Sequence, residues 1–117
     1  KYLRDHPVER LTIAGGFAKL TKLAQGALDL HSARSQVDMG FLAEIAAEAG
    51  APGNLKDRIL FANTAKEVLD MTSAIGLDIA TPVALKARET ALATLRGAPV
   101  EVEIIVTDRE GNILARV

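Results

Sequence analysis

The stretch VERLTIAGGFAKLTKLA (residues 8–24) decides the expected fold, because it joins a short apolar run to a helix through two glycines. Residues 8–14 have the composition of a β-strand that ends at Gly15 and Gly16. A strand that enters glycines and then a helix is the first half of a βαβ unit. Helical spacing predicts a helix over residues 17–28, with an apolar stripe formed by Phe17, Leu20, Leu23, Ala24, Ala27 and Leu28.

Two helices are expected between residues 35 and 62. Ser35 followed by Asp38 resembles a capping signal, and the helix after it should stop at Gly50, with Pro52 beyond. Asn54 is expected to open a short helix through residue 60. The alternative is that residues 58–62 (RILFA) form a buried strand, and the sequence leaves both possibilities open.

Two more helices are expected between residues 64 and 96. Thr64 and Glu67 make a capping box for a helix that ends at Gly76. Its inward side chains should be Ala65, Val68, Leu69, Thr72 and Ile75. Thr81 is expected to cap the next helix, with Pro82 as the first helical residue, where a missing N–H group costs nothing.

The end of the chain predicts a β-hairpin. Residues 99–117 (PVEVEIIVTDREGNILARV) alternate apolar and polar side chains around a turn at 108–111. Glu101 and Glu103 fall on the polar side of this alternation and mark a solvent face. The fold class is therefore α/β: a strand, glycine turn and helix, several further helices, a hairpin and a Rossmann-like partial sheet. Residues 1–117 are expected to form a single domain, a C-terminal fragment of a longer chain that begins here at Lys1.

Composition excludes several classes of function. The formal net charge of −1 and the four aromatic residues (three Phe, one Tyr) argue against a nucleic-acid partner. The absence of cysteine excludes disulfides, a thiolate zinc site and a cysteine nucleophile. His6 and His31, the two histidines, cannot form a closed zinc site by themselves, so no metal site is expected. The apolar runs are too short to span a bilayer, and a cytoplasmic location is expected.

The glycine turn and the helix after it are the first candidate site. Gly15 and Gly16 follow the carboxyl end of a strand, where open α/β sheets bind ligands and where helix N–H groups favour an anion. They could equally form only a tight turn, and no complete GxGxxG motif is present. Lys19 and Lys22 are one turn apart and could hold two carboxylates of a polyanionic ligand. An ordinary solvent-facing pair of lysines is the alternative.

The loop after this helix is the second candidate site. His31 could transfer a proton near neutral pH, and Arg34 could hold a carboxylate with two hydrogen bonds. Ser32 lies beside His31, but neighbours in sequence seldom form a catalytic pair. Capping and turn chemistry over residues 29–35 remains the alternative.

The stretch from Gly15 to Gly26 (GGFAKLTKLAQG), followed by Leu30, His31 and Ser32, resembles the C-terminal part of the CbiD family. The Ala62-Asn63-Thr64 step and the closing strand, Asp-Arg-Glu-Gly turn and final strand are also similar to that family. The resemblance spans nearly the whole chain. One departure is that Ala33 separates the His-Ser pair from Arg34, where many members have arginine directly after His-Ser.

The resemblance implies a methyltransferase that acts on C1 of cobalt-precorrin-5B in cobalamin (vitamin B12) biosynthesis. It implies S-adenosyl-L-methionine as methyl donor and a cobalt-corrinoid precursor as acceptor, with cobalt present only as part of that substrate. It also implies that Gly15, Gly16, Lys19, Lys22, Ser32 and Arg34 bind the acceptor, that His31 adjusts its protonation, and that the family's N-terminal part is a partner. A fragment alone would be inactive.

Two other functions remain open from the residues. The chain could be a non-catalytic binding or interface module for an anionic metabolite or a protein partner. It could also belong to an unrelated α/β enzyme whose glycine turn binds a phosphate.

Overall fold

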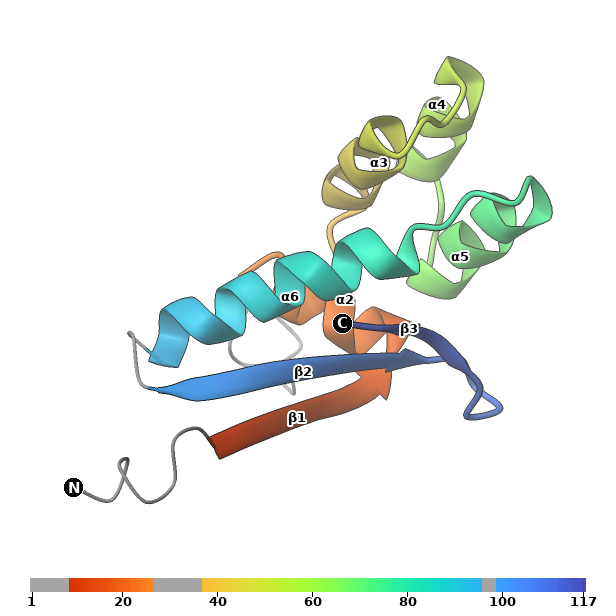
Figure 1. Cartoon of the computed structure of the whole chain (residues 1–117). Coiled ribbons are helices and arrows are strands. Elements are labelled where there is room, and N and C mark those ends of the chain that lie inside the picture. The colour runs from red at the N-terminus through yellow and green to blue at the C-terminus, as the bar shows by residue number, and fades with distance from the viewer. Residues whose placement is uncertain (1–8, 27–36, 96–98) are drawn as a thin grey trace.

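The structure is a computed structural model of the 117-residue chain that describes residues 9–26, 37–95 and 99–117. Within these ranges the chain forms three strands and five helices, which confirms the mixed α/β class (Figure 1). In chain order the elements are β1 (Glu9–Gly16), α2 (Phe17–Ala24), α3 (Met39–Glu48), α4 (Gly53–Leu60), α5 (Ala65–Ala74), α6 (Ala80–Leu95), β2 (Val100–Thr107) and β3 (Ile113–Arg116).

The three strands form one sheet in the order β1-β2-β3. β1 and β2 run parallel over eight residue pairs, from Glu9 opposite Val100 to Gly16 opposite Thr107. β3 returns antiparallel to β2 with an irregularity between Val106 and Thr107, which confirms the predicted hairpin. Parallel strands cannot be joined by a tight turn and require a long crossover connection. In this chain the crossover from β1 to β2 contains all five described helices.

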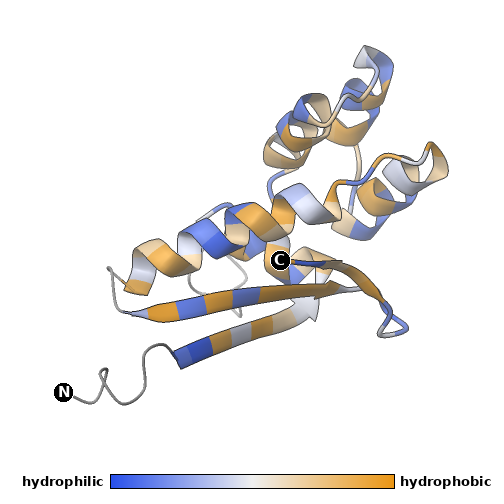
Figure 2. Ribbon diagram, viewed as in Figure 1, coloured by the Kyte–Doolittle hydropathy of each residue, from blue (hydrophilic) through white to orange (hydrophobic). Residues whose placement is uncertain are grey.

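Helices α2 and α6 cover one face of the sheet (Figure 1). The alternation along β2 decides which face is covered, because every second residue from Val102 to Val106 is apolar and buried, whereas Ile105 lies on the other face. Figure 2 shows this alternation of hydrophobic and hydrophilic residues along the strand. Val102, Ile104 and Val106 are buried there against the alanine-rich side of α6. Helices α3, α4 and α5 pack on one another and extend away from the sheet beyond α2 and α6.

The two glycines belong to β1 and not to a turn after it. Gly15 pairs with Val106 and Gly16 with Thr107, so the predicted strand end at residue 14 is wrong by two residues. α2 then begins at Phe17 without any intervening loop, with Gly16 as its N-cap. The helix also ends earlier than predicted, at Ala24, because Gly26 adopts a left-handed conformation with φ +90° that stops it.

The predicted helices of the middle segment are confirmed, but the N-cap of the first is Asp38 and not Ser35, which lies outside the described residues. Asp38 caps α3 by accepting hydrogen bonds from the N–H groups of Gly40 (2.9 Å) and Phe41 (3.4 Å). Gly50 follows that helix with φ +105°. Residues 58–62 are not a strand, since α4 runs through Leu60. Helical spacing with Phe41, Leu42 and Ile45 predicts an inward position for Ala49, but Ala49 is exposed.

The capping box of α5 is confirmed with one difference. Thr64 Oγ1 accepts a hydrogen bond from the Glu67 N–H group (3.1 Å), as a capping box requires. The Glu67 carboxylate accepts its hydrogen bond from the N–H group of Asn63 (3.1 Å) and not from the N–H group of Thr64, the cap residue. Val68 and Thr72 face inward as predicted. Ile75 is 56% exposed, so its predicted inward position is wrong.

Helix α6 begins before the predicted cap. Its first residue is Ala80, and Asp78 Oδ1 accepts the Thr81 N–H group at 3.1 Å, so Asp78 does the capping that was assigned to Thr81. Pro82 is still in the first turn, where the helix does not need its N–H group.

The second face of the sheet is mainly polar in the described residues, with Ile105 as an apolar exception. Glu103 accepts hydrogen bonds from Thr12 Oγ1 (2.9 Å) and Arg116 Nε (2.6 Å), which join all three strands. Arg10 lies 3.5 Å from Glu101 on the same face. The prediction that Glu101 and Glu103 mark a solvent face is confirmed. Within the described ranges, none of the helices has the length and apolar character to cross a membrane.

Candidate functional site

A cavity of about 470 Å³ opens at the carboxyl end of the two parallel strands. Gly16 and Thr107, the last residue pair of β1 and β2, both line it. Open α/β sheets bind ligands at this edge, because loops and helix N-termini converge there. The position agrees with the site expected from the strand–glycine–helix pattern, although the glycines themselves are in the strand.

Two helices begin at this cavity. α2 contributes Phe17 and Ala18, and the start of α5 contributes its N-cap Thr64 together with Ala65 and Lys66. No side chain caps the first N–H groups of α2, and its first turn holds no acidic residue. The start of α2 therefore offers free donors with partial positive charge.

An apolar wall closes the cavity between these helices and the hairpin. It is formed by Phe17, Leu69 of α5 and Leu114 of β3. Leu69, Leu114 and Ser73 also line a second hollow of about 340 Å³ that continues along α5 toward residues 76–80. The two hollows therefore lie next to each other beside α5.

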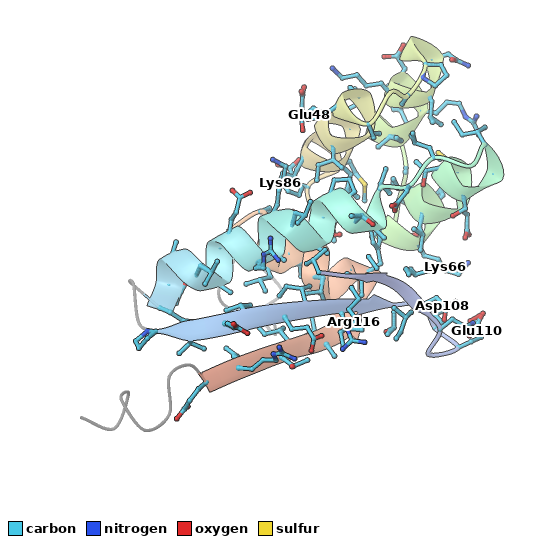
Figure 3. The ribbon with its side chains drawn as sticks, in the orientation of Figure 1. Glu48, Lys66, Lys86, Asp108, Glu110 and Arg116 are labelled. Carbon is cyan, nitrogen blue, oxygen red and sulfur yellow. The ribbon has the colours of Figure 1, made fainter. Side chains whose placement is uncertain are left out.

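Charged side chains gather at the mouth. Lys66 of α5 lies at the same end of the molecule as Asp108 and Glu110 of the β2–β3 turn (Figure 3). Lys66 Nζ forms an ion pair with Asp70 at 2.8 Å, one helical turn further on. Arg109 also lines the cavity.

Asp108 holds the turn together. Its Oδ1 accepts the N–H groups of Glu110 and Asn112, each at 2.9 Å, and its Oδ2 accepts Asn112 Nδ2 at 3.1 Å. These hydrogen bonds, led by the Asn112 side chain, hold the pKa of the Asp108 carboxyl below its ordinary value. Gly111 completes the turn with φ +87°. Asp108 thus fixes the backbone that carries Arg109 and Glu110.

Of the four residues predicted as a site in the glycine segment (Gly15, Gly16, Lys19 and Lys22), only Gly16 lines the cavity. The carbonyl oxygen of Gly15 accepts a hydrogen bond from Thr107 Oγ1 at 3.3 Å directly behind it. Lys19 and Lys22 are not among its lining residues. The side chain of Lys19 instead passes over Gly15, and its position is exposed.

The second predicted group lies outside the described residues. His31, Ser32 and Arg34 fall in the range 27–36, and His6 falls in the range 1–8. Their assigned roles stay predictions. In the part of the chain that the structure describes, no group of three or more histidine, cysteine, aspartate or glutamate side chains could hold a metal ion.

Sequence reasoning missed the charged residues at the cavity mouth. Lys66 and Arg109 looked like ordinary surface residues in a helix and a hairpin turn. The available signal was topological: Arg109 follows a strand that is parallel to β1, so its turn had to lie beside the glycines. That parallel pairing was not deducible from a hairpin pattern alone.

A family model described as "CbiD, C-terminal domain" matches residues 29–117. The chain belongs to the CbiD family. The matched range begins after α2, yet β1 pairs with β2 over its full length, so the folded unit includes residues ahead of the match.

Curated CbiD relatives match the whole chain. Proteins named cobalt-precorrin-5B C(1)-methyltransferase from Brucella ovis, Brucella canis and Brucella melitensis are each 78% identical over 117 residues. The match covers 100% of this chain and 32% of each relative. The chain therefore spans about a third of the length of these relatives. None of the solved protein structures matches it.

Proposed function

We propose that this chain is the C-terminal part of a cobalt-precorrin-5B C1-methyltransferase of cobalamin biosynthesis. The observation that carries the proposal is the 78% identity over all 117 residues to relatives of that name. We further propose that residues 1–117 form one domain that works in the cytoplasm. Its three strands would be part of a larger, Rossmann-like sheet shared with the rest of the protein.

The implied reaction transfers a methyl group between two bound substrates. S-adenosyl-L-methionine would supply an electrophilic methyl group on a sulfonium, and cobalt would enter only as part of the corrinoid precursor. The ring carbon C1 would displace the sulfur in a single step, with the bonding electrons staying on sulfur. Such a displacement needs no covalent bond to the protein, so the protein's work is positioning and electrostatics.

The cavity supports the proposal because its composition fits one of these substrates. It combines an apolar wall, several hydroxyl groups and charges of both signs, at the edge of a sheet where ligands bind. Its volume lies in the range of sites for ligands of this size.

The residues assigned to the acceptor complete the proposal. The basic side chains of Lys19, Lys22 and Arg34 would hold carboxylates of the macrocycle, Gly15 and Gly16 would allow close approach, and Ser32 would add a hydrogen bond. His31 would adjust protonation as C1 becomes nucleophilic. The exposed position of Lys19 agrees with such a role.

The test uses the full-length protein with methyl-labelled S-adenosylmethionine and cobalt-precorrin-5B. We expect labelled corrinoid from the wild type and a loss of transfer in a variant that combines Lys19→Gln, Lys22→Gln, His31→Gln and Arg34→Gln. Lys86→Gln, on α6 and away from the cavity, is the control. If the combined variant turns over unchanged, these residues do not take part in methyl transfer. They would then belong to a non-catalytic binding or interface module.

A further inference from the structure

The charges around the cavity select between the two substrates of the proposed reaction. Its lining contains two cations, Lys66 and Arg109, and three carboxylates, Asp70, Asp108 and Glu110. A ring that carries several carboxylates requires a site with excess positive charge, because each unpaired protein carboxylate near it is repulsive. The cavity has the opposite balance.

Most of these charges are already engaged by the protein. Lys66 pairs with Asp70 at 2.8 Å, and Asp108 accepts the hydrogen bonds of its own turn. Arg109 and Glu110 differ, since within the described ranges neither side chain forms an ion pair or a hydrogen bond. One free cation and one free carboxylate, adjacent in sequence, thus line the cavity from a turn whose backbone is fixed by the hydrogen bonds of Asp108.

A free guanidinium beside a free carboxylate matches a ligand group that carries both charges. The amino-acid end of the methyl donor has a carboxylate and an ammonium group on the same carbon. A guanidinium binds carboxylates through two parallel hydrogen bonds, and a glutamate accepts hydrogen bonds from an ammonium group. The remaining adenosine part requires an apolar surface and hydroxyl partners, which Phe17, Leu69 and Ser73 offer.

We infer that this cavity binds the methyl donor, with Arg109 contacting the carboxylate and Glu110 the ammonium of its amino-acid end. The inference rests on the proposed function and deepens it. Gly16, which lines the cavity, would then lie where the two substrates meet, and the rest of the corrinoid is left to surfaces outside it. This is consistent with Lys19 and Lys22 of α2 not being among its lining residues.

The test measures binding by the full-length protein, not activity. Dissociation constants are determined by calorimetry for S-adenosylhomocysteine and for 5′-methylthioadenosine, which lacks the amino-acid end. Arg109→Gln and Glu110→Gln should each weaken S-adenosylhomocysteine binding about tenfold or more, the usual size of a lost charged contact. Binding of 5′-methylthioadenosine should stay within about twofold of the wild type.

Two matched variants control for the loss of a surface charge. Arg58→Gln on α4 and Glu48→Gln on α3 remove exposed charges that line none of the described cavities and form no ion pair in the described ranges. Both should bind the two nucleosides like the wild type. Retained 5′-methylthioadenosine binding in the cavity variants also shows that they are folded.

Three results would overturn the inference. Unchanged S-adenosylhomocysteine binding in both cavity variants, or equal weakening of both nucleosides, would mean that the turn does not recognise the amino-acid end. A change in corrinoid binding alone would assign the cavity to the acceptor. In these cases the proposed function stands, whereas a wild-type protein that binds no S-adenosylhomocysteine and transfers no methyl group would refute both.

Discussion

The side chain of Lys19 crosses Gly15 so closely that a Cβ atom at position 15 would lie 2.9 Å from Lys19 Cδ and 3.0 Å from Leu20 Cδ2. Leu20 is fully buried, so it cannot move aside without disturbing the core. Lys19 is exposed and flexible, so the contact with buried Leu20 is the one that limits the room for a larger residue at position 15. The second glycine, Gly16, has no atom within 4 Å of such a Cβ and faces the cavity.

This difference predicts opposite outcomes for two neighbouring substitutions. Gly15→Ala should lower the free energy of unfolding by about 1 kcal/mol or more, because a packed core must shift to admit the methyl group. Gly16→Ala should change it by less than about 0.5 kcal/mol, because the site is open and the lower entropy of the unfolded chain offsets the loss of a glycine that is favoured over alanine at an N-cap. Urea unfolding of the two variants measures both values. Equal destabilisation by the two substitutions would show that the close approach of Lys19 and Leu20 does not make position 15 less tolerant of a methyl group than position 16.

The second prediction concerns acid stability. The hydrogen bond from Arg116, followed by that from Thr12, lowers the pKa of Glu103 below its ordinary value of 4.5. The unfolded chain therefore takes up this proton at higher pH than the folded one. The stabilisation of the folded protein by the charged Glu103 carboxylate is fully present above pH 4.5. It is lost as the pH falls through the pKa of Glu103 in the folded state.

Glu103→Gln should remove this part of the pH dependence. We expect the difference in unfolding free energy between wild type and variant to shrink as the pH falls from about 6 to about 3 in urea titrations. Glu48→Gln controls for the loss of a surface carboxylate. A difference that stays constant with pH would mean that the contacts to Arg116 and Thr12 do not favour the charged form.

The third prediction concerns the start of α5, which forms one wall of the cavity. Thr64→Ala removes the acceptor for the Glu67 N–H group and should destabilise the protein by about 1 kcal/mol. Thr94→Ala, in the exposed last turns of α6, should be nearly neutral because alanine favours helices. Thermal unfolding distinguishes the two. Similar effects of both changes would argue that the cap contributes nothing specific.

The fourth prediction separates the two interpretations of the α2 lysines. If Lys19 and Lys22 bind carboxylates of the corrinoid, Lys19→Gln combined with Lys22→Gln should raise KM for the corrinoid about tenfold, the equivalent of two modest charge contacts. The unfolding free energy should stay unchanged, because neither lysine has a protein ion pair in the described ranges. Steady-state kinetics of the full-length enzyme, with Lys86→Gln as control, provide the measurement. An unchanged KM would identify them as ordinary solvent-facing lysines.

Local signals in the sequence predicted most of the elements, because they act between near neighbours. Asp38, Thr64 and Gly50 mark helix ends through hydrogen bonds and conformations confined to a single turn. The hairpin follows from alternation around one turn. Errors arose where two signals competed, as at Asp78 and Thr81, both of which can cap a helix.

The candidate site was predictable only in part. The glycines pointed to the right edge of the sheet, and Gly16 does line the cavity. Arg109 and Glu110 are separated from Gly16 by more than 90 positions, and no local pattern connects them.

The sequence by itself determined the helices, the hairpin and the family, since capping, periodicity and family-specific residues are all written along the chain. Only the tertiary structure decided that β1 pairs with β2 in parallel, and hence that the β2–β3 turn meets the start of α2. Pairing between distant strands depends on which apolar faces are buried together, and this property belongs to the packed core of the molecule and to no single segment.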